Sequence, residues 1–161
     1  MPRTKFEKVV FTLLTVTITV HLFVFYNLAI EMGGMSNQVF IESRKIIFIE
    51  FIFALGLQLF IAGPASLKIA FNIVHPQKDK MYIVSTVISC STMILMCPMM
   101  TFVATVIHDG LSVEFVAQWM QKIVINFPFA FFTQLFFIQP LVRFIFSAIF
   151  RKNRESNLIL E

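Results

Sequence analysis

A single glutamate, Glu50, lies within an apolar run, residues 46–62, that holds no other charged side chain. Placing a charge in the middle of a membrane span costs about 3 kcal/mol on insertion scales, so ionisable residues there usually face a bundle interior or a cavity and mark transport paths. The chemistry that this predicts is the binding and release of a proton or another cation. The alternative is that Glu50 reaches the headgroups at the outer boundary, or pairs with Lys45 or Lys122.

Three amides extend this polar set. Asn126 follows Glu50 by 76 positions, and Gln134 follows Gln58 by the same interval. Glu50 and Gln58 lie about 80° apart on a helix, so they form a polar edge along it. If the two halves of the chain face each other, these four side chains converge as a polar belt and are candidates for coupling. Hydrogen bonds between helices are the alternative, which we favour for the two glutamines.

A second set of residues has the chemistry of a soft-metal site. Cys90, Met93, Cys97 and Met100 follow one face of a helix. Thiolate and thioether groups select Cu(I), and His21, in the middle of another apolar segment, would complete such a site. The alternative is packing, since methionine fills irregular gaps and free cysteine behaves as a small hydrophobe.

Hydroxyl side chains form two helical stripes. They are Thr12, Thr15 and Thr19 in one segment, and Ser85, Ser89 and Thr92 in another. Small hydroxyl residues at such spacings let membrane helices approach closely, so we expect these stripes to serve helix packing.

The sequence holds no motif typical of enzymes. It contains no Gly-rich phosphate loop, no His-Glu-x-x-His helix and no nucleophile elbow. His108 and Asp109 adjoin before Gly110, a pattern typical of a helix end. We therefore expect no enzymatic activity and no cofactor. The net charge of +4 does not indicate nucleic-acid binding, because no basic patch lies on a soluble surface.

The elements that position these residues are four apolar helices. The chain is 58% hydrophobic and 14% charged, with a mean hydropathy of +0.83, whereas soluble domains carry about 25% charged residues. The apolar segments are residues 9–30, 46–62, 81–107 and 123–142. Helices of this length span a bilayer core of about 30 Å. The second segment is expected to continue past its proline, and no alternation of apolar and polar residues indicates a β-barrel.

Prolines are tolerated in membrane helices, where they produce bends. We expect kinks near Pro64, Pro98, Pro128 and Pro140.

The basic residues predict the orientation. Ten of the 13 precede the first segment, lie around the central connection or follow the last segment. Under the positive-inside rule, both termini and the central connection then face the cytoplasm.

An internal repeat organises the chain. A shift of 76 positions, without gaps, superposes Gln58-Leu59-Phe60 on Gln134-Leu135-Phe136 and Pro64 on Pro140. This predicts two parallel helix-loop-helix repeats in an all-α membrane protein with four transmembrane helices. The single membrane domain, residues 1–161, would comprise repeat 5–74, polar linker 75–80, repeat 81–150 and basic tail 151–161.

The repeated Gln-Leu-Phe-x-x-x-Pro block, followed by Lys68 in one copy and Arg143 in the other, resembles an uncharacterised bacterial membrane family catalogued as domain of unknown function 2798. Residues 126–143 of the second copy are most similar to its pattern, while the first copy has Glu50 where Asn126 falls. The resemblance covers nearly the whole chain. It implies a small multi-pass protein of the bacterial inner membrane and brings no established activity.

Three functional hypotheses follow. The first is a small proton- or cation-coupled transporter or efflux protein, in which Glu50 exchanges protons or cations against an apolar or cationic solute in a Phe-lined cavity. The second is a structural or accessory membrane subunit without transport, and the third is a Cu(I)-handling protein. We prefer the first. The expected partner is the lipid bilayer, and a homodimer is the expected working form because four helices enclose little volume; the sequence identifies no soluble partner.

Overall fold

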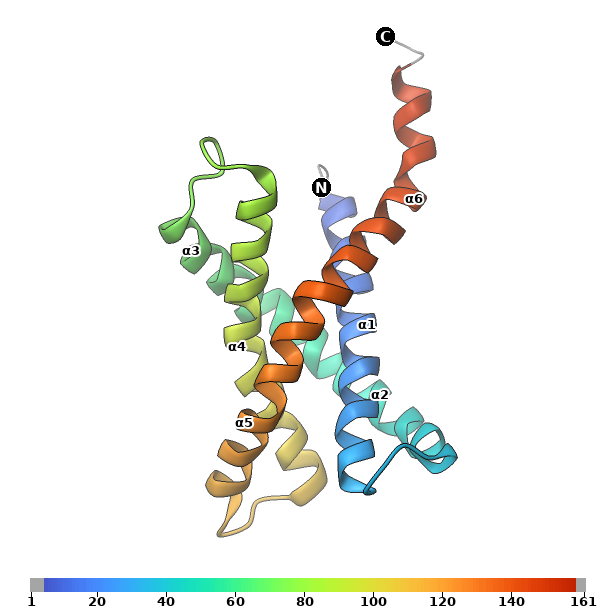
Figure 1. Cartoon of the computed structure of the whole chain (residues 1–161), viewed down its shortest axis with the longest axis vertical. Helices are drawn as coiled ribbons and strands as arrows, with labels where there is room; N and C mark the ends of the chain where they lie inside the picture. The colour runs from blue at the N-terminus through green and yellow to red at the C-terminus, as the bar shows by residue number, and fades with distance from the viewer. Residues whose placement is uncertain (1–4, 159–161) are drawn as a thin grey trace.

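The structure, a computed structural model, describes residues 5–158, with side-chain detail for residues 6–150. Every regular element in this range is helical (Figure 1). The elements are α1 (Lys5–Glu31), α2 (Asn37–Leu57), η1 (Gln58–Ala62), α3 (Gly63–Ile73), α4 (Met81–Asp109), α5 (Phe115–Thr133), η2 (Gln134–Ile138) and α6 (Gln139–Leu158). The predicted basic tail lies outside the part of the chain whose side chains are described.

Four continuous helices are long and apolar enough to cross a membrane. They are Phe6–Glu31, Asn37–Ile73, Met81–Asp109 and Phe115–Phe150. Large apolar side chains point away from the molecule; Phe48, Phe60 and Phe144 leave 68%, 82% and 72% of their surface exposed. Soluble proteins rarely expose such surfaces continuously, whereas lipid covers them in a membrane. The prediction of four spanning helices is confirmed.

The second and fourth spans are longer than the apolar segments that predicted them. They run for 37 and 36 residues, and a helix of that length measures about 55 Å, well beyond a hydrocarbon core of about 30 Å. Hydropathy falls at Arg44 and Lys45, but the helix begins earlier, because arginine and lysine are good helix formers. Such spans tilt or extend into the headgroup region.

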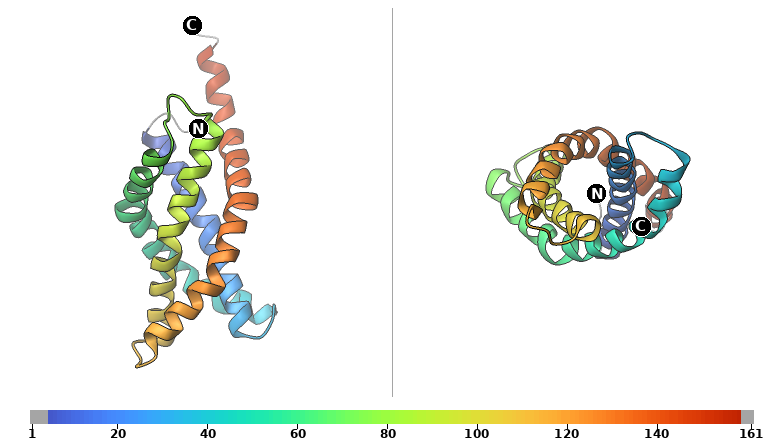
Figure 2. Two further views of the ribbon diagram at one scale, coloured as in Figure 1. Left: turned by 60° about the vertical axis from the view of Figure 1, so that its left-hand side comes forward. Right: turned by 90° about the horizontal axis from the view of Figure 1, so that it is seen from below.

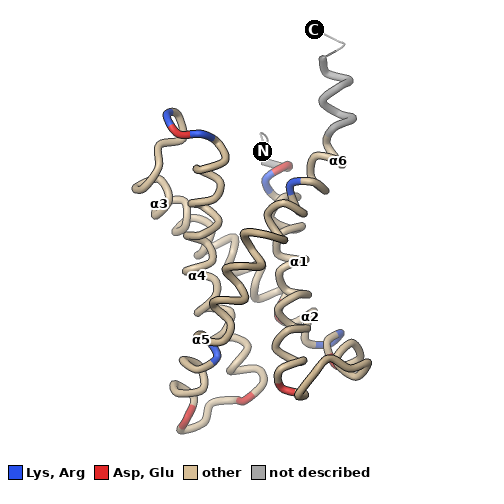
Figure 3. Tube along the Cα trace, in the orientation of Figure 1, with Lys and Arg blue, Asp and Glu red and all other residues tan. Residues whose placement is uncertain are grey.

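The two helix-loop-helix units enter from the same end of the molecule. The start of α1, the end of α6 and the linker between α3 and α4 lie toward one end, called the terminal end, in Figure 1. The connections 32–36 and 110–114 lie at the opposite end, called the loop end. Figure 2 shows the four spans arranged around a common axis, and Figure 3 shows the charged residues mostly toward the two ends. The predicted parallel arrangement of the repeats is confirmed.

A π-helical turn interrupts the second helix of each unit at the same place, η1 in one and η2 in the other. Each turn ends two residues before a proline, Pro64 or Pro140. Proline has no N–H to donate, and its ring clashes with the carbonyl four residues earlier. The chain accommodates this with a wider turn, in which the N–H of Gly63 donates to the carbonyl of Gln58; η2 has the equivalent bond. The kinks expected at these two prolines therefore take the form of π-helical turns.

The other two prolines lie inside helices that keep their α-helical type, Pro98 in α4 and Pro128 in α5. The carbonyl of Pro98 accepts a hydrogen bond of 3.0 Å from Nε1 of Trp119, which joins α5 to α4.

Trp119→Phe tests the contribution of this bond. It keeps an aromatic ring near Phe102, whose ring centroid lies 5.5 Å from that of Trp119, and removes the donor. We expect the free energy of unfolding in mixed micelles to fall by about 0.6 kcal/mol, the average for a hydrogen bond between membrane helices. Titration with a denaturing detergent measures it, and an unchanged midpoint would show that the bond contributes nothing.

Small residues and one aromatic stack hold the spans together. Ala54, Ala62, Ala70 and Ala130 are at most 2% exposed, which lets the helix backbones approach closely. Tyr26 of α1 and Phe129 of α5 stack with ring centroids 3.8 Å apart. This stack joins the first unit to the second.

Candidate functional site

A cavity of about 750 Å³ lies between the four spans, and every span contributes to its wall. Lys8 and Arg143 line it toward the terminal end, and Asn27 and Glu50 line it toward the loop end. This space is called the central cavity.

All four residues predicted for the polar belt line the central cavity: Glu50, Gln58, Asn126 and Gln134. Glu50, Asn126 and Gln134 are 5%, 3% and 4% exposed. The structure therefore brings side chains of both units, at positions related by the 76-residue offset, into one cavity wall. Their role in coupling stays a prediction.

The favoured alternative for the glutamines, hydrogen bonding between helices, is wrong for the side-chain oxygen of Gln134. That atom and Oδ1 of Asn126 have no hydrogen-bond partner, and the same is true of Thr19 Oγ1 and Gln139 Oε1. All four residues line the central cavity. A buried polar atom left without a partner costs about 1–3 kcal/mol. The oxygens themselves have almost no accessible surface, so a bond to a solute in the cavity requires these side chains to turn toward it.

The hydroxyl stripes also face this space. Thr12, Thr15, Thr19, Ser85, Ser89 and Thr92 all line the central cavity. The sequence interpretation assigned them to packing and missed their place in the wall. The available signal was that each stripe follows one face of the first helix of its unit.

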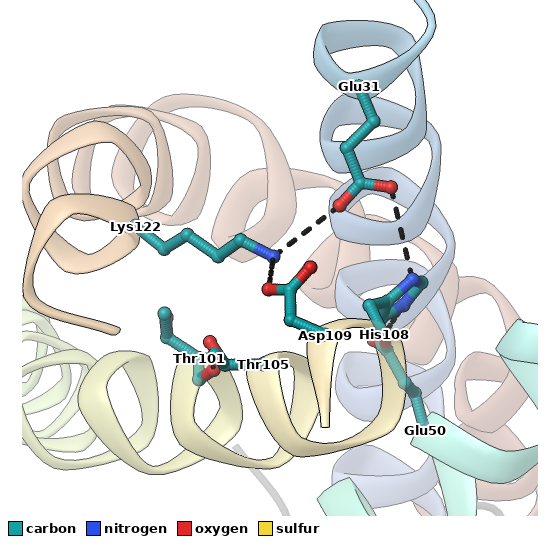
Figure 4. A network of polar contacts seen from close by, with 7 residues as sticks. All are labelled: Glu31, Glu50, Thr101, Thr105, His108, Asp109 and Lys122. Atoms are coloured by element: carbon teal, nitrogen blue, oxygen red, sulfur yellow. Dashed lines mark hydrogen bonds and ion pairs between the residues drawn. The ribbon is translucent and has the colours of Figure 1, made fainter. Parts of the chain in front are cut away.

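Glu50 belongs to a connected network of ionisable side chains at the loop end (Figure 4). Nε2 of His108 lies 3.5 Å from Oε1 of Glu50, and Nδ1 of the same ring lies 3.9 Å from Oε2 of Glu31. Nζ of Lys122 lies 3.5 Å from Oε1 of Glu31 and 2.7 Å from Oδ2 of Asp109. The network joins α1, α2, α4 and α5. It is called the loop-end network below.

The partner of Glu50 is His108, not Lys45 or Lys122. The Glu50 side chain is only 6% exposed, so the expectation that it reaches the headgroups is wrong. The pairing with Lys122 is also wrong, because that ammonium lies between Glu31 and Asp109 (Figure 4).

His108 is the residue that sequence reasoning missed. The helix does end beside it, and Gly110 adopts a φ of 71° there. The imidazole nevertheless turns inward toward α1 and α2 and is 16% exposed. Within its own segment His108 carries only the signal of a helix end, because its partners come from two other helices.

A second cavity, of about 240 Å³, opens beside this network at the loop end. Glu31, Asp109 and Lys122 line it, together with Asn27 and Asn126. The two asparagines also line the central cavity. Asn27 and Asn126 therefore stand at the boundary between the two spaces.

The structure does not assemble the soft-metal site. Nδ1 of His21 lies 2.7 Å from the carbonyl oxygen of Thr17 in its own helix. Met93 and Cys97 are buried against the α5 helix, and Cys90 is half-buried. Within the described residues, no three His, Cys, Asp or Glu side chains gather in a way that could hold a metal ion. The imidazole is held by its own backbone instead of completing a site with the sulfurs.

Comparison with known proteins identifies the family. The family model described as domain of unknown function 2798 matches twice, over residues 4–74 and 80–150. An uncharacterised protein, YybC of Bacillus subtilis strain 168, is 31% identical over 101 residues, which is 61% of this chain and 64% of that relative. The match thus spans less than two thirds of the relative's length. No solved structure matches. With two copies of the domain covering the four spans, the chain belongs to the family of domain of unknown function 2798.

Proposed function

We propose that this protein is a multi-pass carrier of the bacterial inner membrane, with both termini in the cytoplasm, that couples the passage of a small solute to a proton or another cation. The observation that supports it is the central cavity, in which a buried glutamate and four residues with unpartnered polar atoms line one space between four spans. The solute would pass without covalent change.

The wall chemistry favours an aromatic or aliphatic cation. The volume of about 750 Å³ falls in the range of about 300–1,000 Å³ that small-molecule sites occupy. Phe11, Phe23 and Phe146 contribute ring surface to the wall, and aromatic faces attract organic cations. Lys8 and Arg143 lie toward the terminal end of the wall and Glu50 toward the loop end, so a cation would bind in the loop-end half beside the Glu50 carboxylate.

The accessory-subunit hypothesis explains the cavity less well. A helix-bundling role would pair Asn126 and Gln134 across the interface, yet their oxygens have no partner. The homodimer stays a prediction, but its argument from volume no longer applies, because one chain alone supplies the wall of the central cavity.

Ethidium, a planar aromatic cation, is a suitable probe for this proposal. We expect saturable binding to the purified protein in nanodiscs, seen as a rise in ethidium fluorescence. Cys97 lines the central cavity and Cys90 does not. The reactivity of the Cys97 thiol therefore reports on the cavity, and that of the Cys90 thiol reports on a position outside it. Ethidium should slow alkylation of Cys97 in a Cys90→Ser background.

The control is alkylation of Cys90 in a Cys97→Ser background, which ethidium should leave unchanged. Absence of saturable binding, or equal protection of both thiols, would contradict an organic cation in the central cavity.

A further inference from the structure

His108 lies between the central cavity and the second cavity at the loop end. Its Nε2 lies 3.5 Å from Glu50, which lines the central cavity, and its Nδ1 lies 3.9 Å from Glu31, which lines the second cavity. His108 itself lines neither space. The imidazole therefore lies between two carboxylates, with one ring nitrogen turned toward each (Figure 4).

The exposure of the three side chains falls along this path. Glu31 is 39% exposed, His108 16% and Glu50 6%. The sequence of groups thus leads from solvent at the loop end to a desolvated carboxylate inside the membrane. Imidazole is suited to such a place, because it can accept a proton on one nitrogen and release one from the other near neutral pH.

We propose that His108 is the proton-transfer residue that connects Glu31 with Glu50 and so delivers the coupling proton from the loop end. A proton on the Glu31 carboxyl passes to Nδ1 of the neutral ring and leaves a carboxylate. The N–H at Nε2 then gives its proton to the Glu50 carboxylate. The ring ends neutral as the other tautomer, and one proton has moved.

Both distances exceed the usual hydrogen-bond range of about 2.7–3.2 Å. Transfer therefore requires a small approach of the side chains or one bridging water. Charge around the ring favours the protonated intermediate, since Glu31 and Glu50 supply two carboxylates against the single ammonium of Lys122, which itself pairs with Asp109.

The inference rests on the proposed function, and its test separates the two. Vesicles containing the protein are loaded with ethidium and diluted into a weakly buffered medium without it. Ethidium leaving the vesicle should draw protons in, and a pH electrode records the external alkalinisation. Ethidium release is followed in parallel by fluorescence.

We expect His108→Gln to lower ethidium-driven proton movement at least about a hundredfold, the range typical for losing a positioned proton-transfer group. His21→Gln is the matched control, because this second histidine within a span lines neither cavity; it should behave as wild type. Glu31→Gln interrupts the same path one group earlier and should also reduce proton movement, which keeps the test valid if His108→Gln fails to fold.

The outcomes are distinguishable. Wild-type rates in folded His108→Gln or Glu31→Gln would overturn the relay and leave the carrier proposal standing. Ethidium release without proton movement in the wild-type protein would do the same. A wild-type protein that neither binds nor releases ethidium above protein-free vesicles would overturn the proposed function and the relay with it.

Discussion

Replacing Glu50 by glutamine is expected to abolish proton-coupled ethidium exchange while the folded protein stays abundant. Glutamine has nearly the same shape and can still contact His108, but it cannot carry the negative charge or the exchanged proton. We expect the exchange rate in proteoliposomes to fall at least about a hundredfold. Thermal stability should be unchanged or higher, because the variant removes an ionisable group that is 5% exposed within a span.

Glu42→Gln is the matched control, since Glu42 lies on the same helix and is exposed. It should exchange ethidium as wild type does. A destabilised but fully active Glu50→Gln protein would identify Glu50 as a structural residue and contradict the coupling role.

Asn126→Leu is expected to move activity and stability in different directions. Asn126 stands at the boundary between the two cavities, so a leucine there puts an apolar side chain on the path between them. We expect ethidium exchange to fall to the level of protein-free vesicles. Because Oδ1 of Asn126 has no partner to lose, the free energy of unfolding should be unchanged or raised by about 1 kcal/mol.

The control is Asn72→Leu, which makes the same change at an exposed position of α3. Detergent-induced unfolding and vesicle exchange are measured on both variants. Loss of stability in Asn126→Leu with exchange retained would favour the accessory-subunit hypothesis, because it would show that the amide holds helices together.

The fold was largely predictable because its signals are local or repeated along the chain. The length of the apolar segments predicted the four spans, and the 76-residue offset predicted the two parallel units. Helix ends were not predictable from hydropathy, since Arg44 and Lys45 end the apolar signal without ending the helix. The π-helical form of the bends before Pro64 and Pro140 was also beyond a pattern of residue types, because it depends on which carbonyl each N–H selects.

The candidate site was also predictable only where its signal is repeated along the chain. Glu50 and Asn126 were found together because a symmetry of the sequence relates them. His108 was missed because its partners, Glu31 and Glu50, come from two other helices and share no spacing with it. Its local neighbours indicate only a helix end. A residue whose role depends on contacts between distant segments leaves little trace in a single sequence.

The exchange of one acidic side chain for an amide between the two units has a consequence for stoichiometry. An assembly of two identical single-unit chains would carry the same residue in both halves, either two carboxylates or none. The fused chain instead places Glu50 in one half of the wall and Asn126 in the other. A carrier of this design would move one proton for each monovalent cation in the opposite direction. Such an exchange is electroneutral, so its driving force is the pH difference and not the membrane potential.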